Sequence, residues 1–124
     1  PKRINWSFGN RSQLVRIPAA HPGAGRMELR SPDPACNPYL AFALVLAAAM
    51  EGITEVTPLQ APLDDSGSLP ESLEEAISLA EKSAFIREVL PENVIEAYLA
   101  EKKKTAARFE ADANAVFQQH LRTI

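Results

Sequence analysis

An apolar run at residues 39–50 constrains the fold of this chain more than any other feature. Asn37 can cap the start of a helix there, Pro38 suits its first turn, and Gly52 stands where a left-handed residue often ends a helix. The run is apolar on every side, so we expect it to be buried all round, against the preceding sheet or against neighbouring subunits. It is too short to span a membrane, which takes about 20 apolar residues.

Two short strands are predicted before this helix. Residues 12–17 and 26–30 have strand-like sequences, and residues 18–25 between them contain two prolines and two glycines, which favour a loop. We therefore predict an antiparallel hairpin with unpaired edges that favour self-association. Its loop is long for a hairpin, and long irregular loops are often functional, so we expect it to form one wall of a ligand site.

Shorter helices are predicted in the second half of the chain. Residues 54–68 contain two prolines, adjacent aspartates and a glycine, which indicate a surface connection. Ser72 and Glu75 have the spacing of a capping box that opens a second helix. Ser83 can cap a short third helix that ends near Leu90.

A fourth helix is expected from Pro91 onward. Apolar residues at near-helical spacing, Phe117 among them, continue to Leu121, so this helix can reach about 30 residues or roughly 45 Å. A small body cannot bury such a length. We expect the helix either to break near residues 102–104 or to project and pack on another chain.

The composition bounds the chain to one globular piece. With 124 residues, 46% of them hydrophobic, it can build one modest core but not two ordinary domains. We predict an α+β fold, with a short antiparallel β-hairpin followed by a mainly helical C-terminal body. Residues 1–35 form the strands and the ligand-binding segment of this single piece, and residues 36–124 are helical.

The single cysteine and the uneven charge distribution limit the compartments and ligand classes expected for this chain. Cys36 is the only cysteine, which excludes an internal disulfide and fits a reducing compartment, so we expect the cytoplasm. Residues 1–30 hold six bases and one acid (+5), and residues 31–124 hold seven bases and fifteen acids (−8). A short basic segment on an acidic body favours the binding of small anions over nucleic acid.

The basic segment contains an alternating charged pattern. If residues 26–30 are extended, Arg26, Glu28 and Arg30 share one face, and Met27 and Leu29 point into a core. A carboxylate suits a hard divalent cation, and guanidinium groups suit phosphates and carboxylates. The trio therefore fits chemistry on a metal-bound phosphate. The alternative is the solvated face of an antiparallel sheet, with Glu28 paired to Arg26 or Arg30.

Several short motifs follow one another in the first half of the chain. They are Trp6-Ser7, Asn10-Arg11-Ser12, Leu14-Val15-Arg16-Ile17-Pro18, Arg26-Met27-Glu28-Leu29-Arg30-Ser31-Pro32-Asp33-Pro34-Ala35, Asn37-Pro38-Tyr39-Leu40 and Gly52-Ile53. In this order they resemble the C-terminal part of glutamine synthetases of type I. The resemblance is strong over residues 1–53, weaker over 69–102 and close to absent over the last twenty.

This resemblance implies a role for each charged residue. Glutamine synthetases form an acyl phosphate from glutamate and ATP and let ammonia displace the phosphate, with two divalent metals, Mg or Mn. The resemblance makes Glu28 a metal ligand and Arg30 a catalytic residue that also binds glutamate. It makes Arg11, Arg16 and Arg26 nucleotide-binding residues, and it makes Arg11 a substrate-binding residue as well. Arg11 and Arg16 can converge only if Arg11 lies in a loop.

The resemblance also implies what this piece lacks. The chain starts within a family motif, so we expect a fragment that is inactive alone, with the remaining metal ligands upstream and active sites shared between subunits of a homo-oligomer. Residues 54–69 contain no tyrosine for regulatory adenylylation, so we predict none. His21 and His120 are expected at the surface. Two alternatives stay open: a γ-glutamyl-amine ligase that uses an organic amine such as a polyamine, or a non-catalytic structural or regulatory relative.

Overall fold

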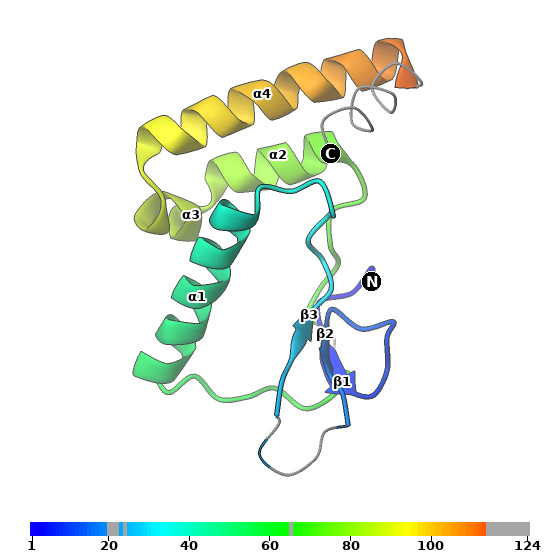
Figure 1. The fold of residues 1–124 in the computed structure, drawn as a ribbon, viewed down its shortest axis with the longest axis vertical. Helices are drawn as coiled ribbons and strands as arrows, with labels where there is room; N and C mark the ends of the chain where they lie inside the picture. Colours follow the sequence, from blue (N-terminus) through cyan, green and yellow to red (C-terminus); the bar gives the residue numbers. More distant parts are fainter. Residues whose placement is uncertain (20–22, 24, 65, 114–124) are drawn as a thin grey trace.

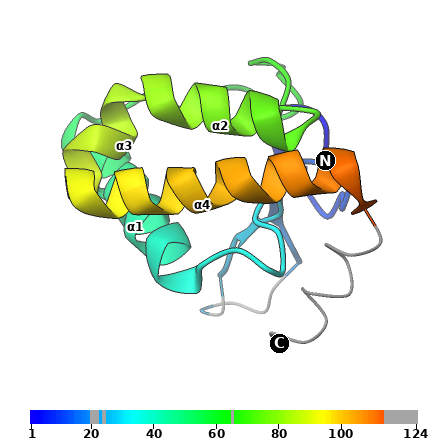
Figure 2. The same ribbon diagram turned by 90° about the horizontal axis from the view of Figure 1, so that it is seen from above.

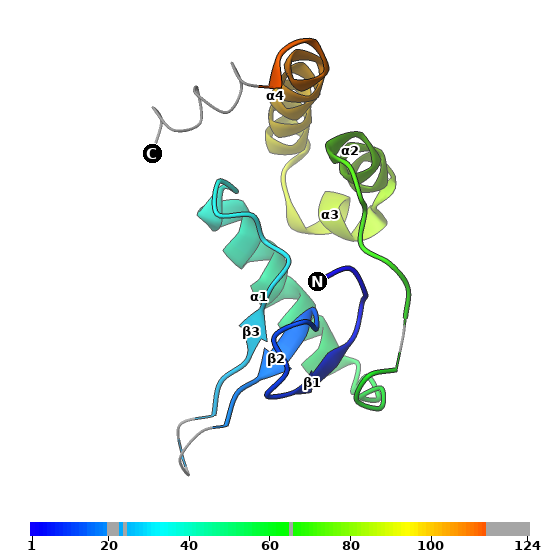
Figure 3. The ribbon, with the colours of Figure 1, turned by 90° about the vertical axis from the view of Figure 1, so that its right-hand side faces the viewer.

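The computed structural model describes residues 1–19, 23, 25–64 and 66–113. In chain order its elements are β1 (Trp6–Phe8), β2 (Val15–Ile17), β3 (Glu28–Leu29), α1 (Pro38–Thr54), α2 (Leu73–Lys82), α3 (Ala84–Val89) and α4 (Glu92–Ala111). The predicted α+β class is confirmed, with the sheet and the α2–α4 layer at opposite ends of the molecule and α1 running from α3 down beside the sheet (Figures 1 and 3). Within the described ranges, no helix has the length and apolar character needed to cross a bilayer.

The sheet has three strands in the order β1-β2-β3. β2 pairs antiparallel with β3, which confirms the predicted hairpin, and it pairs parallel with β1, which the sequence did not predict. Three residues are too few for a recognisable strand pattern, so β1 is defined by its partner. Residues 20–22 and 24 of the hairpin loop, His21 among them, lie outside the described residues, and the role of this loop stays a prediction.

The outer edge of β1 is covered by the connection between α1 and α2 (Figure 1). Leu63 N donates to Trp6 O at 2.9 Å, Ile4 N donates to Gly67 O at 2.8 Å, and Trp6 Nε1 donates to Gln60 O at 2.8 Å. The expectation that the hairpin has unpaired edges is therefore wrong for the β2 edge, because β1 pairs with β2 and the predicted surface connection turns back along β1. These bonds fix β1 from a segment more than fifty residues away in sequence.

α1 begins as predicted and ends later than predicted. Asn37 Oδ1 accepts hydrogen bonds from Tyr39 N and Leu40 N, at 3.0 and 3.3 Å. The helix continues through Gly52 to Thr54, so the predicted end at Gly52 is wrong. Val56 takes the left-handed position with φ 50°, and Thr57 N closes the turn on Gly52 O at 3.1 Å. This is a Schellman ending with a β-branched residue where glycine is preferred.

The expected burial of α1 on every side does not occur within this chain. No residue of α1 is buried, and Tyr39 is 82% exposed. α1 packs on α3 and borders an apolar hollow of about 310 Å³ shared with α3 and α4. Its other face carries an exposed apolar stripe, because the described chain offers no further layer to cover it. The stripe consists of Tyr39, Phe42, Leu46, Met50 and Ile53.

The caps of the next two helices are confirmed. Ser72 Oγ accepts from Glu75 N at 3.1 Å at the start of α2, and Ser83 Oγ accepts from Ile86 N at 3.2 Å at the start of α3. The Glu75 carboxylate accepts from Glu71 N at 2.8 Å, one residue before the position expected in a capping box.

α4 is one continuous helix of 20 residues. It runs without interruption through residues 102–104, so a break at the lysines is excluded, and Lys103 pairs with Glu81 of α2. α2 and α4 lie side by side (Figures 1 and 2), and the buried apolar residues of the described chain are Ile77, Ile95 and Ala106. The predicted extension through Phe117, His120 and Leu121 lies outside the described residues.

Candidate functional site

Strand pairing places three polar side chains in one row across the sheet. Ser7 pairs with Arg16, and Arg16 pairs with Glu28, so all three lie on the same face. The opposite face carries an apolar row made of Trp6, Val15 and Leu29. The sheet therefore has one chemical face and one packing face.

Arg16 and Glu28 form the central ion pair of this row. Arg16 Nη1 donates to both carboxylate oxygens of Glu28, at 2.9 and 2.8 Å. Arg16 Nε donates to Gly9 O at 3.0 Å, which holds the guanidinium in place. The Arg16 side chain is 14% exposed and that of Glu28 is 32% exposed, so the pair is partly shielded from water but reachable from one side.

Two further arginines flank the same carboxylate. Arg26 Nη2 lies 3.8 Å from Glu28 Oε1, and Arg30 Nη1 lies 3.9 Å from Glu28 Oε2. The prediction that Arg26, Glu28 and Arg30 share a face is confirmed, and Glu28 does form ion pairs. Its closest partner, however, is Arg16 on the neighbouring strand. Three guanidinium charges and one carboxylate charge leave a net charge of +2, which favours a bound anion.

The arginines keep Glu28 ionised. The hydrogen bonds from Arg16 lower the pKa of Glu28 below its usual value of 4.5, partial desolvation opposes this, and the positive charges of Arg16, Arg26 and Arg30 lower it further. The carboxylate is therefore negatively charged at neutral pH.

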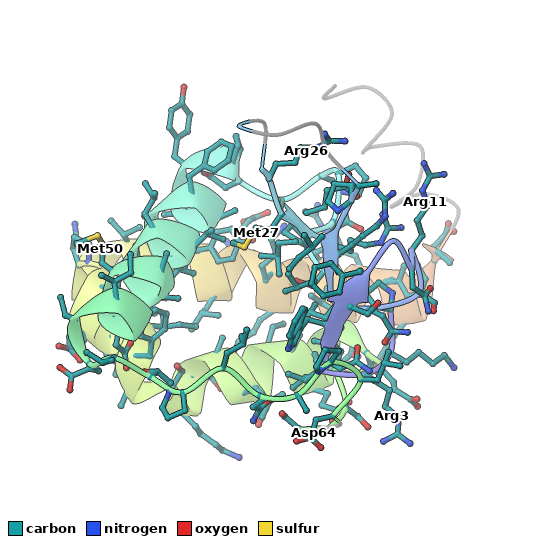
Figure 4. All side chains as sticks on the ribbon, turned by 90° about the horizontal axis from the view of Figure 1, so that it is seen from below. Arg3, Arg11, Arg26, Met27, Met50 and Asp64 are labelled. Atoms are coloured by element: carbon teal, nitrogen blue, oxygen red, sulfur yellow. The ribbon has the colours of Figure 1, made fainter. Side chains whose placement is uncertain are left out.

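Arg11 lies in the loop between β1 and β2, as its predicted role requires. Gly9 has φ +70°, and Asn10 Oδ1 accepts a hydrogen bond from Ser12 N at 2.9 Å, which makes a tight turn around Arg11. The same loop holds Arg16 through Gly9 O. In Figure 4, Arg11 and Arg26 reach outward on the sheet side of the molecule.

The prediction that Met27 points into a core is wrong. Met27 is 56% exposed and points from the sheet towards α1 in Figure 4, whereas Leu29 is half-buried and lines the apolar hollow. Met27 precedes the two-residue strand β3, and little of this chain packs over its side chain. The half-buried thiol of Cys36 also lines the hollow, without a catalytic partner assigned to it.

Glu28 fits one ligand of a metal site rather than a complete site. Among the described residues, no three histidine, cysteine, aspartate or glutamate side chains are grouped so that they could hold a metal ion. Both Glu28 oxygens accept from Arg16, so cation binding requires this pair to loosen. A hard carboxylate beside anion-binding arginines suits Mg²⁺ or Mn²⁺ that arrives with phosphate.

Sequence reasoning missed the polar role of β1. Ser7 is only 6% exposed, and the buried atoms Ser7 Oγ and Asn5 Oδ1 have no hydrogen-bond partner among the described residues. The alternation of Ser7 between Trp6 and Phe8 fits a strand with one packing face, but three residues alone are too few to identify a strand from the sequence.

Comparison with known proteins gives one consistent family. The family model for the glutamine synthetase catalytic domain matches residues 1–119, further along the chain than the motif resemblance predicted. The chain is 42% identical to the glutamine synthetase of Methanosarcina mazei, over 90% of this chain and 28% of that protein. It is 40% identical to that of Thermotoga maritima, over 88% and 28%, and 36% identical to that of Halobacterium salinarum, over 92% and 28%.

The chain thus spans about 28% of the length of these curated relatives. The family model covers nearly all of this chain, and the identities exceed one third over most of it. Together these matches show that the chain belongs to the glutamine synthetase family.

Proposed function

We propose that this chain is the C-terminal portion of the catalytic domain of a glutamine synthetase. The reaction is the ATP-dependent ligation of ammonia to glutamate through γ-glutamyl phosphate. The observation that carries the proposal is the convergence of Arg16, Arg26 and Arg30 on Glu28, which leaves a net charge of +2 on one face of the sheet. Family membership supports the same reaction.

In this proposal each charged residue has the role that the resemblance to glutamine synthetases implies. Glu28 ligates Mg²⁺ or Mn²⁺, and Arg11, Arg16 and Arg26 bind the nucleotide. Arg11 also contacts substrate. Arg30 binds glutamate and acts as the catalytic residue. Its guanidinium lies 3.9 Å from Glu28, a long contact that leaves its donors available to a transferring phosphoryl group.

The chemistry of these residues is electrostatic. Phosphoryl transfer develops charge on the equatorial oxygens, and preorganised guanidinium donors stabilise that charge. Arg16 is held by Gly9 O independently of Glu28, so this anchor remains when Glu28 binds a cation. The divalent cation, when bound, neutralises phosphate charge.

The active protein, in this proposal, is longer than this chain and oligomeric. Glu28 alone cannot hold two metals, so we expect the remaining ligands from other segments and no activity from this piece alone. The exposed stripe on α1 supports further protein packing there, and active sites are shared between subunits. We place the protein in the cytoplasm, since its lone cysteine suits a reducing compartment.

The test is ATP hydrolysis by the full-length polypeptide with glutamate and Mg²⁺, first with ammonia and then with a panel of amines. Ammonia-dependent turnover that Glu28→Ala abolishes, and that the exposed control Glu88→Ala retains, supports the proposal. Turnover only with an organic amine assigns the protein to γ-glutamyl-amine ligation. Absence of turnover with every acceptor contradicts both and favours a non-catalytic role.

A further inference from the structure

Two buried polar atoms, one in β1 and one in the residue before it, have no hydrogen-bond partner among the described residues. Ser7 is 6% exposed, and its hydroxyl oxygen and the amide oxygen of Asn5 accept no hydrogen bond among the described residues. Buried polar groups in proteins are almost always paired, so orphaned atoms next to a candidate site call for a functional reason.

Both atoms belong to the chemical face of the sheet. Val15 N donates to Asn5 O at 3.1 Å, so the parallel ladder continues one residue beyond β1 and keeps Asn5 and Ser7 on one side. Ser7 pairs with Arg16, and neighbouring strands lie about 4.8 Å apart. Rotation of the Ser7 side chain can therefore turn its hydroxyl towards Arg16 on the neighbouring strand without a movement of the backbone.

Arg16 needs another acceptor whenever Glu28 is engaged elsewhere. Its side chain is 14% exposed, and the acceptors of its Nη1 group are the two Glu28 oxygens. A cation at Glu28 competes for those oxygens. Without a replacement acceptor, the shielded guanidinium would either lose hydrogen bonds or turn away from the site.

We propose that Ser7 is a positioning residue that receives Arg16 when Glu28 binds a divalent cation. The Ser7 hydroxyl oxygen, together with Asn5 Oδ1, accepts the N–H that Glu28 releases. Arg16 then stays on the chemical face and remains aimed at phosphate. This inference rests on the proposed function through the cation, but the pairing of Ser7 with a released Arg16 can be measured without it.

The first test is a double-mutant cycle on the unfolding of the full-length protein. Ser7→Ala alone should change the unfolding equilibrium constant less than twofold, because Glu28 still holds Arg16. In a Glu28→Ala background, the same substitution should raise the unfolding equilibrium constant about fivefold to tenfold, since Arg16 then depends on Ser7. The exposed Ser31→Ala serves as control in both backgrounds. Equal effects of Ser7→Ala in both backgrounds overturn the proposal.

The second test measures Mn²⁺ binding to the full-length protein by electron paramagnetic resonance. Ser7→Ala should weaken Mn²⁺ binding about fivefold, and Ser7→Thr, which keeps the hydroxyl, should restore most of the affinity. Unchanged Mn²⁺ affinity in Ser7→Ala overturns the inference and leaves the proposed function standing. Failure of the unsubstituted protein to bind Mn²⁺ overturns the metal role of Glu28, and the unfolding cycle then decides the pairing of Ser7 with Arg16 alone.

Discussion

Removal of the Arg30 side chain should separate catalysis from folding. In the full-length protein, we expect Arg30→Ala to lower kcat about 10²–10³-fold, about 2.7–4 kcal/mol in the barrier, as for other preorganised donors to developing charge. The KM for ATP should change much less, because Arg11, Arg16 and Arg26 still bind the nucleotide.

The geometry of Arg30 explains why the fold should tolerate this change. Arg30 contributes to the sheet through its backbone, since Arg30 N donates to Leu14 O at 2.8 Å, and alanine keeps that bond. Its side chain is one-third exposed, and its ion pair with Glu28 spans 3.9 Å. An exposed, long ion pair contributes about 0.5 kcal/mol or less to stability.

The assay is steady-state formation of ADP with ammonia and glutamate, together with thermal unfolding of each variant. Arg87→Ala is the matched control, because it removes an exposed arginine that pairs with Glu92 at the far helical end of the molecule. A kcat within threefold of the unsubstituted enzyme would refute the catalytic role of Arg30. A fall in kcat that merely follows a fall in unfolding temperature would refute the separation of catalysis from folding.

Three further predictions concern packing, strain and charge. Ile95→Ala should lower the free energy of unfolding, measured with urea, by about 2–5 kcal/mol, because Ile95 is 3% exposed. Ile53→Ala should lower it by about 0.5 kcal/mol or less, because Ile53 is 71% exposed. Val56→Gly should raise stability by about 0.5–1 kcal/mol in the same assay, since it relieves a left-handed β-branched residue. A carbon NMR titration should place the pKa of Glu28 below 4.5, and nearer 4.5 in Arg16→Ala. Because the pKa is lower in the folded state, the ionised Glu28 stabilises the fold above pH 4.5, and this stabilisation is lost as the pH falls through the folded pKa.

Local signals predicted local structure well. Asn37, Ser72 and Ser83 cap helices as expected, because a cap is decided by a side chain and backbone groups two or three positions away. Gly52 misled for the same reason: a glycine near a helix end is a common stop, but α1 continues for two residues beyond it, and the left-handed residue is Val56.

Long-range features could not be predicted in this way. β1 depends on its register with β2, on the hydrogen bond that Trp6 donates to Gln60 O and on the one that Leu63 N donates to Trp6 O, which no short window of sequence contains. The dominant partner of Glu28 was missed because Arg16 is twelve positions away and meets it only through strand pairing. The charged pattern of β3 was sufficient to predict the shared face of Arg26, Glu28 and Arg30, since alternation is local.

The apolar face of the sheet selects the geometry of the chemical face. A one-residue slip of β2 would move Arg16 to the packing face and Val15 to the chemical face, which would break the pair with Glu28. The row of Trp6, Val15 and Leu29 opposes such a slip, and Gly9 N binding to Ile17 O at 2.9 Å opposes it at the end of β2. The position of the charges is therefore a consequence of hydrophobic packing, so substitutions on the packing face should disturb anion binding even where they touch no ligand.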